Sequence, residues 1–282
     1  MTVTVGGGTL YLAATPIGNL EDITLRAIRV LKEVSLIACE DTRRTRGLLA
    51  HHEIRTPVIS LHEHNERARI PQILKMLQDG KSVALVSDAG TPAVSDPGAA
   101  LVAAAARAEL PIVSVPGPSA VTAAVALADF PAGAFAFLGF PPRRPNERKR
   151  FLSALADLPM ALVIFEAPHR IHETLSDIEE ILGPRRAVMA RELSKMHEEI
   201  LRGTAAEIRA ALATSPRGEV TLVIEGSTAT GRETAVTPML TPQAFIKRLR
   251  TEGLSRRDTA RALAAAYHMR ARDAYRLTTE GT

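Results

Sequence analysis

Short apolar segments that end abruptly in small and turn-forming residues recur along this chain. In the clearest case, the apolar residues 83–86 lead directly into the loop SDAGTPAVSDPG of residues 87–98. A buried strand followed by such a loop is how an open α/β sheet builds a ligand site. Glycine and alanine let a ligand approach the backbone, and Asp88 offers a fixed hydrogen-bond acceptor. One such loop is equally compatible with an ordinary strand–helix connection, and it is the recurrence of the pattern along the chain that favours a ligand site.

Helix-like segments separate these apolar segments. Strand candidates of a first cycle lie at residues 9–14, 35–39, 58–61, 82–87 and 111–115, with helical apolar spacing between them. A second, similar cycle has strand candidates at 134–139, 160–165, 187–191 and 219–225 and helix candidates at 146–156 and 205–213. Such alternation predicts parallel strand–helix–strand units and hence an α/β fold. Asp22 is expected to cap the helix that contains Leu25, Ile28 and Leu31.

The length of 282 residues favours about two domains with a small appendage. We expect a leader at 1–8, an N-terminal α/β domain at 9–131, a C-terminal α/β domain at 132–227, a linker at 228–239 and a basic helical tail at 240–282. The tail carries nine Lys and Arg residues against four Asp and Glu residues. This excess indicates either a surface that faces a polyanion or a solvated helical face.

Several protein classes are excluded by motifs that the chain lacks. The sequence contains no P-loop, no dinucleotide fingerprint and no Gly-x-Ser-x-Gly elbow. His62 and His64 have no third ligand at suitable spacing, so no metal is expected. The single cysteine, Cys39, lies in an apolar strand candidate and is expected to be a buried thiol. No segment has the apolar length of a membrane span or the pattern of a signal peptide, so a cytoplasmic protein is expected.

Seven segments carry a resemblance to a known family: ATPIGNLEDIT, ACEDTRRTRGLL, VSDAGTPAVSDPG, VPGPSAV, FLGFPPR, FEAPHRI and ARELSKMHEE, in this order. Together they resemble the ribosomal RNA small subunit methyltransferase I family, within the tetrapyrrole methylase superfamily. The resemblance implies S-adenosylmethionine as methyl donor and 2′-O-methylation of a cytidine in the decoding region of small-subunit rRNA. It also implies two α/β domains with the cofactor in the cleft between them, and a homodimer.

The resemblance also implies which residues bind the cofactor. They are expected in the first loop, in the loop after residue 86, after the Pro-Gly motif and at the end of the strand near residue 165: Pro16, Gly18, Asp88, Ala89, Gly90, Thr91, Ala93, Ser119, Ala120, Phe165 and Glu166. Ser119 stands where it either binds a ligand or only caps a helix. This chain has Ala89-Gly90-Thr91 where tetrapyrrole enzymes carry Gly-Asp-Pro. That departure argues against a tetrapyrrole precursor as substrate.

A ribose hydroxyl is a poor nucleophile and benefits from a general base. The sequence does not choose among the candidates, which are Asp22, Glu40, Asp41, Glu192 and His197, and Lys195 is a candidate for lowering the pKa of the hydroxyl or for pairing with phosphate. RNA binding needs cations. The candidates at strand ends and in the dense basic cluster of residues 143–150 are Arg43, Arg44, Arg46, Arg143, Arg144 and Arg170, with Arg148, Lys149 and Arg150 in the same cluster.

Two alternative functions stay open at this point. The first is methylation of a tetrapyrrole precursor. The second is a cofactor-binding module that associates with small-subunit rRNA or the assembled 30S subunit without catalysis. Labelling of RNA by a labelled cofactor distinguishes both from an RNA methyltransferase.

Overall fold

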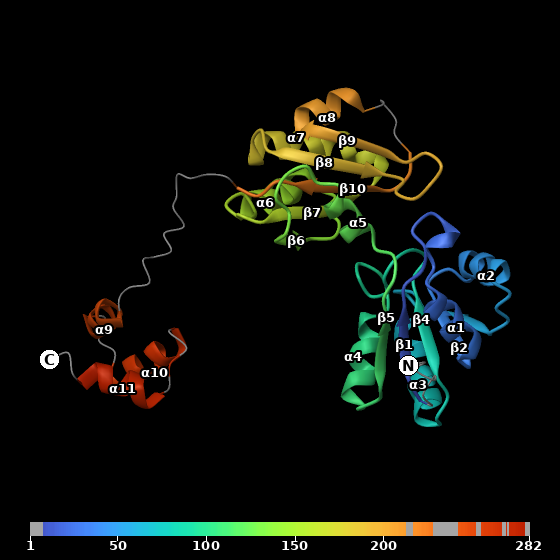
Figure 1. The fold of residues 1–282 in the computed structure, drawn as a ribbon, viewed down its shortest axis with the longest axis horizontal. Helices are drawn as coiled ribbons and strands as arrows, with labels where there is room; N and C mark the ends of the chain where they lie inside the picture. Colours follow the sequence, from blue (N-terminus) through green and yellow to red (C-terminus); the bar gives the residue numbers. More distant parts are fainter. Residues whose placement is uncertain are drawn as a thin grey trace. The chain divides into compact units, whose positions relative to one another are not determined.

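The computed structural model describes residues 8–212, 217–227, 242–251, 255–266, 269 and 271–279. The chain forms two compact units, Met1–Ser227 and Thr228–Thr282. Within the described residues, the first unit contains two five-stranded sheets with helices packed on them, and the second unit contains helices (Figure 1). The predicted α/β fold class with a helical C-terminal region is confirmed.

The first sheet is parallel throughout and has the strand order β3-β2-β4-β1-β5. Its strands coincide with the apolar segments that predict them and are β1 Leu10–Ala13, β2 Leu36–Cys39, β3 Val58–Ser60, β4 Val83–Val86 and β5 Ile112–Val115. Strands β1 and β4 are neighbours, but the chain leaves β1 toward β2 on one side and leaves β4 toward β5 on the other. The connections that follow these two strands therefore run in opposite directions, and open α/β sheets bind ligands at such switch points.

Helices cover both faces of the first sheet: α1 Leu25–Glu33, α2 Thr42–His51, α3 Glu66–Gln78 and α4 Ala99–Arg107. Strand β4 shows why both faces need cover. Its residues Ala84 and Val86 pack in the core that contains residues of α1 and α2, whereas Val83 and Leu85 pack in the core formed with α3 and α4. A strand that is apolar on both sides is typical of a parallel sheet covered on both faces.

The predicted cap at Asp22 is wrong. Helix α1 begins after Thr24, whose side chain accepts a hydrogen bond from the backbone N–H of Ala27 at 3.1 Å. Asp22 instead lies in the short 3-10 helix η1, Leu20–Asp22, which precedes the cap. A side-chain oxygen caps an N–H two or three residues further along the chain, so Thr24 is the residue at the right distance.

The second sheet has the order β6-β7-β10-β8-β9. Its strands are β6 Phe135–Phe137, β7 Ala161–Glu166, β8 Arg186–Arg191, β9 Glu199–Thr204 and β10 Val220–Ile224. Only β6 and β7 pair in parallel; the other pairs are antiparallel. The prediction that the second cycle repeats the parallel units of the first is therefore wrong. Residues 192–198 join β8 to β9 without a helix, a connection that suits an antiparallel pair.

One face of the second sheet is covered by α6 Pro145–Ala154, α7 Ile171–Leu182 and α8 Ala205–Ala211, and the short helix η2 Pro168–Arg170 precedes α7. The other face is covered by α5 Ala120–Ala126, whose Val121 and Ala124 pack against Val163 and Val223. Helix α5 thus packs on the second sheet, although the sequence assigns it to the first domain. We refer to the first sheet with α1–α4 as the first lobe and to the second sheet with α5–α8 as the second lobe.

The described part of the second unit contains α9 Pro242–Thr251, α10 Arg256–Ala266 and α11 Ala271–Thr279. Ile246, Leu263 and Ala274 form its small buried core. The side chain of Ser255 caps α10 by accepting a hydrogen bond from the backbone N–H of Asp258 at 3.2 Å. The predicted linker 228–239 lies outside the described residues, as does the leader except for Gly8.

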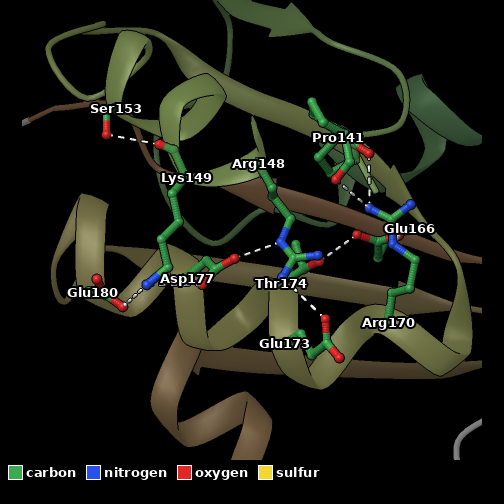
Figure 2. A network of polar contacts seen from close by, with 11 residues as sticks. Pro141, Arg148, Lys149, Ser153, Glu166, Arg170, Glu173, Thr174, Asp177 and Glu180 are labelled. Carbon is green, nitrogen blue, oxygen red and sulfur yellow. Dashed lines mark hydrogen bonds and ion pairs between the residues drawn. The ribbon is translucent and has the colours of Figure 1, made fainter. Parts of the chain in front are cut away.

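A buried ion pair connects α6 to α7. Arg148 is 2% exposed, and its Nε donates to Asp177 Oδ2 at 2.6 Å while its Nη2 donates to Glu173 Oε2 at 3.2 Å (Figure 2). Next to it, Lys149 Nζ donates to Glu180 Oε2 at 2.6 Å. Arg148 therefore does not belong to the solvent-facing basic cluster that the sequence predicts at residues 143–150.

The two lobes approach each other closely where the loop after β1 meets the loop between β8 and β9. The Ser194 hydroxyl donates to Asp22 Oδ2 at 2.7 Å. At Gly18 the approach is so close that an added Cβ would lie 2.5 Å from Lys195 Cγ and 2.6 Å from the carbonyl oxygen of Leu193. Only glycine fits this contact without movement of the second loop.

We predict that Asp177→Ala lowers the free energy of unfolding by about 3 kcal/mol, because it leaves the buried Arg148 guanidinium without its main partner. The matched control is Glu180→Ala, which removes an exposed partner of Lys149 and is expected to cost less than about 1 kcal/mol. Urea unfolding followed by circular dichroism measures both. Equal decreases in the free energy of unfolding of the two variants would contradict the prediction that the buried Arg148–Asp177 pair stabilises the protein more than the exposed pair.

We predict that Gly18→Ala destabilises the protein by about 1–3 kcal/mol, because the new methyl group overlaps backbone atoms of the opposite lobe. Gly47 in α2 provides the control, since a Cβ there meets nothing within 4 Å. Gly47→Ala is expected to stabilise the helix by about 0.5–1 kcal/mol. The measurement is the thermal midpoint of each variant, and a Gly18→Ala protein as stable as the parent would contradict the close contact.

Candidate functional site

A cavity of about 430 Å³ lies at the carboxyl ends of β4 and β5, and residues of both lobes line it. The residues from the first lobe and from the start of α5 include most of those that the sequence predicts for the cofactor: Asp88, Ala89, Gly90, Thr91, Ser119 and Ala120. Phe165 and Glu166 reach it from the end of β7 in the second lobe. The structure thus brings together residues that are up to 78 positions apart in the chain (Asp88 to Glu166).

Pro16, Gly18 and Ala93, also predicted for the cofactor, do not line this cavity. In the first loop, Ile17 lines it instead. The loop is held there by Thr15, whose backbone forms an isolated bridge with Gly90, with N–O distances of 2.9 and 3.0 Å. Because Thr15 also donates its hydroxyl to the Ser87 carbonyl at 3.1 Å, the loops after β1 and β4 form one rigid wall at the switch point.

Asp88 holds the start of α2 in place. One of its carboxylate oxygens accepts the backbone N–H of Asp41 at 3.0 Å, and the other pairs with Arg44 at 3.4 Å. Asp41 is the N-cap of α2 and accepts from the backbone and side chain of Arg43. These bonds from Arg43 lower the pKa of Asp41 to about 2, which makes this candidate a weak base. Glu40 and Arg44 line the cavity.

Residues 94–96 line the cavity and were missed by sequence reasoning. They lie in a strained turn, since Ala93 and Ser95 have φ values of 64° and 63° and Gly98 has φ 116°. Positive φ at a residue other than glycine costs free energy and concentrates at functional sites. A usable signal was present, because the tripeptide Val-Ser-Asp occurs twice in the stretch, at 86–88 and at 94–96. Both aspartates line the cavity.

The carboxyl groups in the cavity repel one another. Burial raises the pKa of Asp96 to about 6, with the negative charges of Glu40, Asp88 and Glu219 adding to the shift and Ser87 opposing it. Burial also raises the pKa of Glu40, and Asp88 adds to that shift. A concave site with perturbed carboxyl groups is typical of a binding or catalytic centre.

Glu166 is buried, and both of its carboxylate oxygens have bonding partners. Its carboxylate accepts from the hydroxyl of Thr174 and the backbone N–H of Ala167, and pairs with Arg170 Nε at 3.2 Å (Figure 2). Arg170 Nη2 in turn donates to the carbonyl oxygens of Pro141 and Pro142 at 2.9 and 3.1 Å. Arg170, predicted for RNA, is thus directed inward, with only 12% of its side chain exposed.

This network fixes the turn that carries Phe140. The ring of Phe140 is 57% exposed, lines the cavity, and lies 5.6 Å from the ring of Phe165. Sequence reasoning did not single out Phe140, although it lies in the motif FLGFPPR. Among the predicted RNA residues, Arg43, Arg44, Arg46, Arg143 and Arg144 are exposed.

The other candidates for proton transfer do not line the cavity. Asp22, Glu192, Lys195 and His197 lie at or near the contact between the lobes or on the loop between β8 and β9. Lys195 Nζ donates to Glu192 Oε1 at 2.8 Å and to Glu219 Oε2 at 3.3 Å. Through Glu219, which lines the cavity, this chain of ion pairs reaches the edge of the site.

The described residues include no group of three or more His, Cys, Asp or Glu side chains placed to hold a metal ion. His62 Nε2 instead shares a hydrogen bond with the Asn65 amide at 3.0 Å. Cys39 is a free, buried thiol, and burial raises its pKa. A helix that could span a membrane is not found in the part of the chain that the structure describes.

Comparison with known proteins agrees with this arrangement. The family model of tetrapyrrole (corrin/porphyrin) methylases matches residues 9–209. A ribosomal RNA small subunit methyltransferase I from Synechocystis is 42% identical over 97% of this chain and 98% of its own length. The protein of the same name from Thermotoga maritima is 48% identical over 78% of this chain and 99% of its own length.

The fold has solved counterparts at low sequence identity. A uroporphyrin-III C-methyltransferase from Thermus thermophilus, complexed with S-adenosylhomocysteine, superposes with a TM-score of 0.56 at 18% identity and covers 76% of this chain and 96% of that chain. A cobalt-precorrin-4 methyltransferase gives a TM-score of 0.59 at 19% identity, over 77% of this chain and 95% of that chain. With the fold, the cavity and the close relatives considered together, the chain belongs to the ribosomal RNA small subunit methyltransferase I family of tetrapyrrole methylases.

Proposed function

We propose that this protein transfers a methyl group from S-adenosylmethionine to the ribose 2′-oxygen of a cytidine in the decoding region of small-subunit rRNA. The observation that carries the proposal is the 42–48% identity to rRNA small subunit methyltransferases over at least 78% of the chain. The substrate is the bare rRNA or the assembled 30S subunit. In keeping with the resemblance, the protein acts in the cytoplasm as a homodimer.

The chemistry of the cavity suits S-adenosylmethionine. This molecule combines an adenine ring, a ribose diol and a positively charged sulfonium, and a cavity of about 430 Å³ has the size of sites for such ligands. Ile17, Val121 and Phe165 supply apolar surface, while Glu40 and Asp96 supply negative charge. Carboxylates favour a cation and accept hydrogen bonds from a diol.

When bound, S-adenosylmethionine supplies an electrophilic methyl carbon. The protein's part is to orient that carbon toward the ribose oxygen, and well-positioned reactants gain at most roughly 7–11 kcal/mol from proximity. The loops after β1 and β4 suit this role because the Thr15–Gly90 bridge makes them one wall. The Glu166–Arg170 pair fixes the opposite wall by holding the turn at Pro141 and Pro142.

Exposed cations and one exposed ring suit an RNA substrate. Arg43 and Arg44 stand at the start of α2, and Arg143 and Arg144 precede α6. Arginine binds phosphate by charge and hydrogen bonds. Phe140, at the cavity, offers a face on which an unstacked base can lie, which is how proteins commonly recognise single-stranded RNA.

Methylation of a tetrapyrrole precursor is the second candidate, and the solved neighbours that are named for it share 18–21% identity with this chain. Such likeness concerns the fold. Ala89-Gly90-Thr91, where tetrapyrrole enzymes carry Gly-Asp-Pro, favours the RNA substrate.

Incubation with radiolabelled S-adenosylmethionine tests the proposal. The purified protein is offered 30S subunits and bare small-subunit rRNA, and label is expected in the RNA at a cytidine 2′-oxygen, located by resistance of the adjacent bond to alkali. Label in a porphyrinoid instead would establish the alternative enzyme. Binding of cofactor and RNA without transfer to either RNA would leave only a binding module.

We predict that Phe140→Ala raises the KM for the RNA substrate by about tenfold, since a base stacked on an aromatic ring gains roughly 1–3 kcal/mol. The affinity for S-adenosylmethionine, measured by calorimetry, is expected to change less than threefold. Phe135→Ala is the control, because Phe135 is also partly exposed but does not line the cavity. Loss of cofactor affinity with an unchanged KM for RNA would assign the ring to the cofactor instead.

A further inference from the structure

The proposed reaction releases a proton from the ribose hydroxyl, and a general base in the cavity would assist this step. Three of the carboxylates that line the cavity already hold other groups. Asp88 is bonded to the N-terminus of α2 and to Arg44, Glu166 is bonded to Thr174, Ala167 and Arg170, and Glu219 is paired with Lys195. Glu40 and Asp96 remain.

Asp96 is the better placed of these two. Among the described residues, its carboxylate forms no ion pair, and the Ser87 hydroxyl, which donates to the carbonyl oxygens of Ala89 and Gly90 at 3.1 and 3.3 Å, only partly offsets the rise in its pKa. The negative groups that raise its pKa are Glu40, Asp88 and Glu219, and Arg44, which lines the same cavity, is paired with Asp88. A carboxylate surrounded by like charges holds a proton more firmly than a paired one, and this is the property that a general base needs near neutral pH.

The backbone around Asp96 adopts a conformation that costs conformational free energy. Ser95, immediately before it, has φ 63°, Ala93 has φ 64°, and Gly98 has φ 116°. A Cβ at Gly98 would lie 2.5 Å from Leu85 Cδ2, so the turn packs directly on the end of β4. The fold therefore presents Asp96 in the cavity from a short, strained segment that is anchored to the core.

We propose, on the basis of the proposed function, that Asp96 is the general base that accepts the ribose 2′-hydroxyl proton as the oxygen attacks the methyl carbon. In this step the bond between the ribose oxygen and the methyl carbon forms, and the sulfur–methyl bond breaks with its electron pair going to sulfur. The hydroxyl proton moves to the Asp96 carboxylate and leaves to water after product release. The products are the methyl ether and the neutral thioether, so atoms and charge balance.

The pKa of Asp96, raised by burial to about 6, fits this role. The carboxylate is ionised at pH 7.5 and can still hold a proton during the step. Because the folded-state pKa lies above the value in the unfolded chain, the ionised carboxylate lowers the stability of the folded protein. That loss is absent well below pH 4, grows between about pH 4 and 6 and is complete above pH 6.

The test compares Asp96→Asn with Glu40→Gln, which removes the same charge from the same cavity, and with Asp79→Asn, an exposed surface control that does not line the cavity. For Asp96→Asn we expect kcat to fall at least 100-fold while the Kd for S-adenosylmethionine, measured by calorimetry, changes less than tenfold. The rise of kcat with pH through about 6 in the parent protein should be lost. Glu40→Gln is expected to keep that pH profile and to lose less than tenfold in kcat.

A second measurement needs neither cofactor nor RNA. The thermal midpoint of Asp96→Asn should exceed that of the parent by roughly 2–5 °C at pH 8, and the difference should shrink as the pH falls toward 4. Asp79→Asn should show no such trend. An aspartate with a purely structural role would give a less stable variant at pH 8, which would overturn the proposal.

The outcomes separate this proposal from the proposed function. If the parent protein does not methylate a ribose oxygen, the proposed function fails first. If the parent does and Asp96→Asn retains its kcat, or loses it only through weaker binding of S-adenosylmethionine, Asp96 is not the base. Transfer of the pH dependence to Glu40→Gln would give the role to Glu40 and would equally overturn the proposal.

Discussion

The pairing of β1 with β4 is the constraint on which the site depends. These two strands are neighbours in the sheet, but the chain leaves them toward opposite sides. The cavity lies at the carboxyl edge of the sheet where these connections begin, and the Thr15–Gly90 bridge joins the two loops into one wall. Asp88 links this wall to the start of α2. The positions of Ile17, Glu40 and Asp96 at the cavity all follow from that edge.

In the second lobe, a buried ion pair holds the residues that line the cavity in place. The buried Glu166 carboxylate pairs with Arg170. Arg170 in turn donates to the carbonyl oxygens of Pro141 and Pro142 and so holds the turn that carries Phe140. Buried charges are costly unless they are paired and hydrogen-bonded, and here the pairing orients an exposed ring beside a cavity. Glu166 and Arg170 are thus bonded to each other and to the turn at Pro141 and Pro142, while Phe140 is exposed beside the cavity.

The relatives differ in how much of this chain they match. The Thermotoga maritima protein is matched over 99% of its own length but covers 78% of this chain, so about a fifth of this chain has no counterpart in it. The Synechocystis protein is matched over 97% of this chain. The described tail helices form a small core of their own around Ile246, Leu263 and Ala274. An addition with its own core can vary among relatives without disturbing the two lobes.

The sequence by itself determined the α/β class, the strands of the first sheet and the loop after β4, because apolar period and turn residues are local properties. It also carried enough motif similarity to indicate the family. Tertiary structure alone decided the antiparallel pairing of the second sheet, the placement of α5, and the burial of Arg148 and Arg170, since each depends on partners distant in the chain. The same holds for Asp96: its Val-Ser-Asp tripeptide is visible in the sequence, but the neighbours that raise its pKa are brought beside it only by folding.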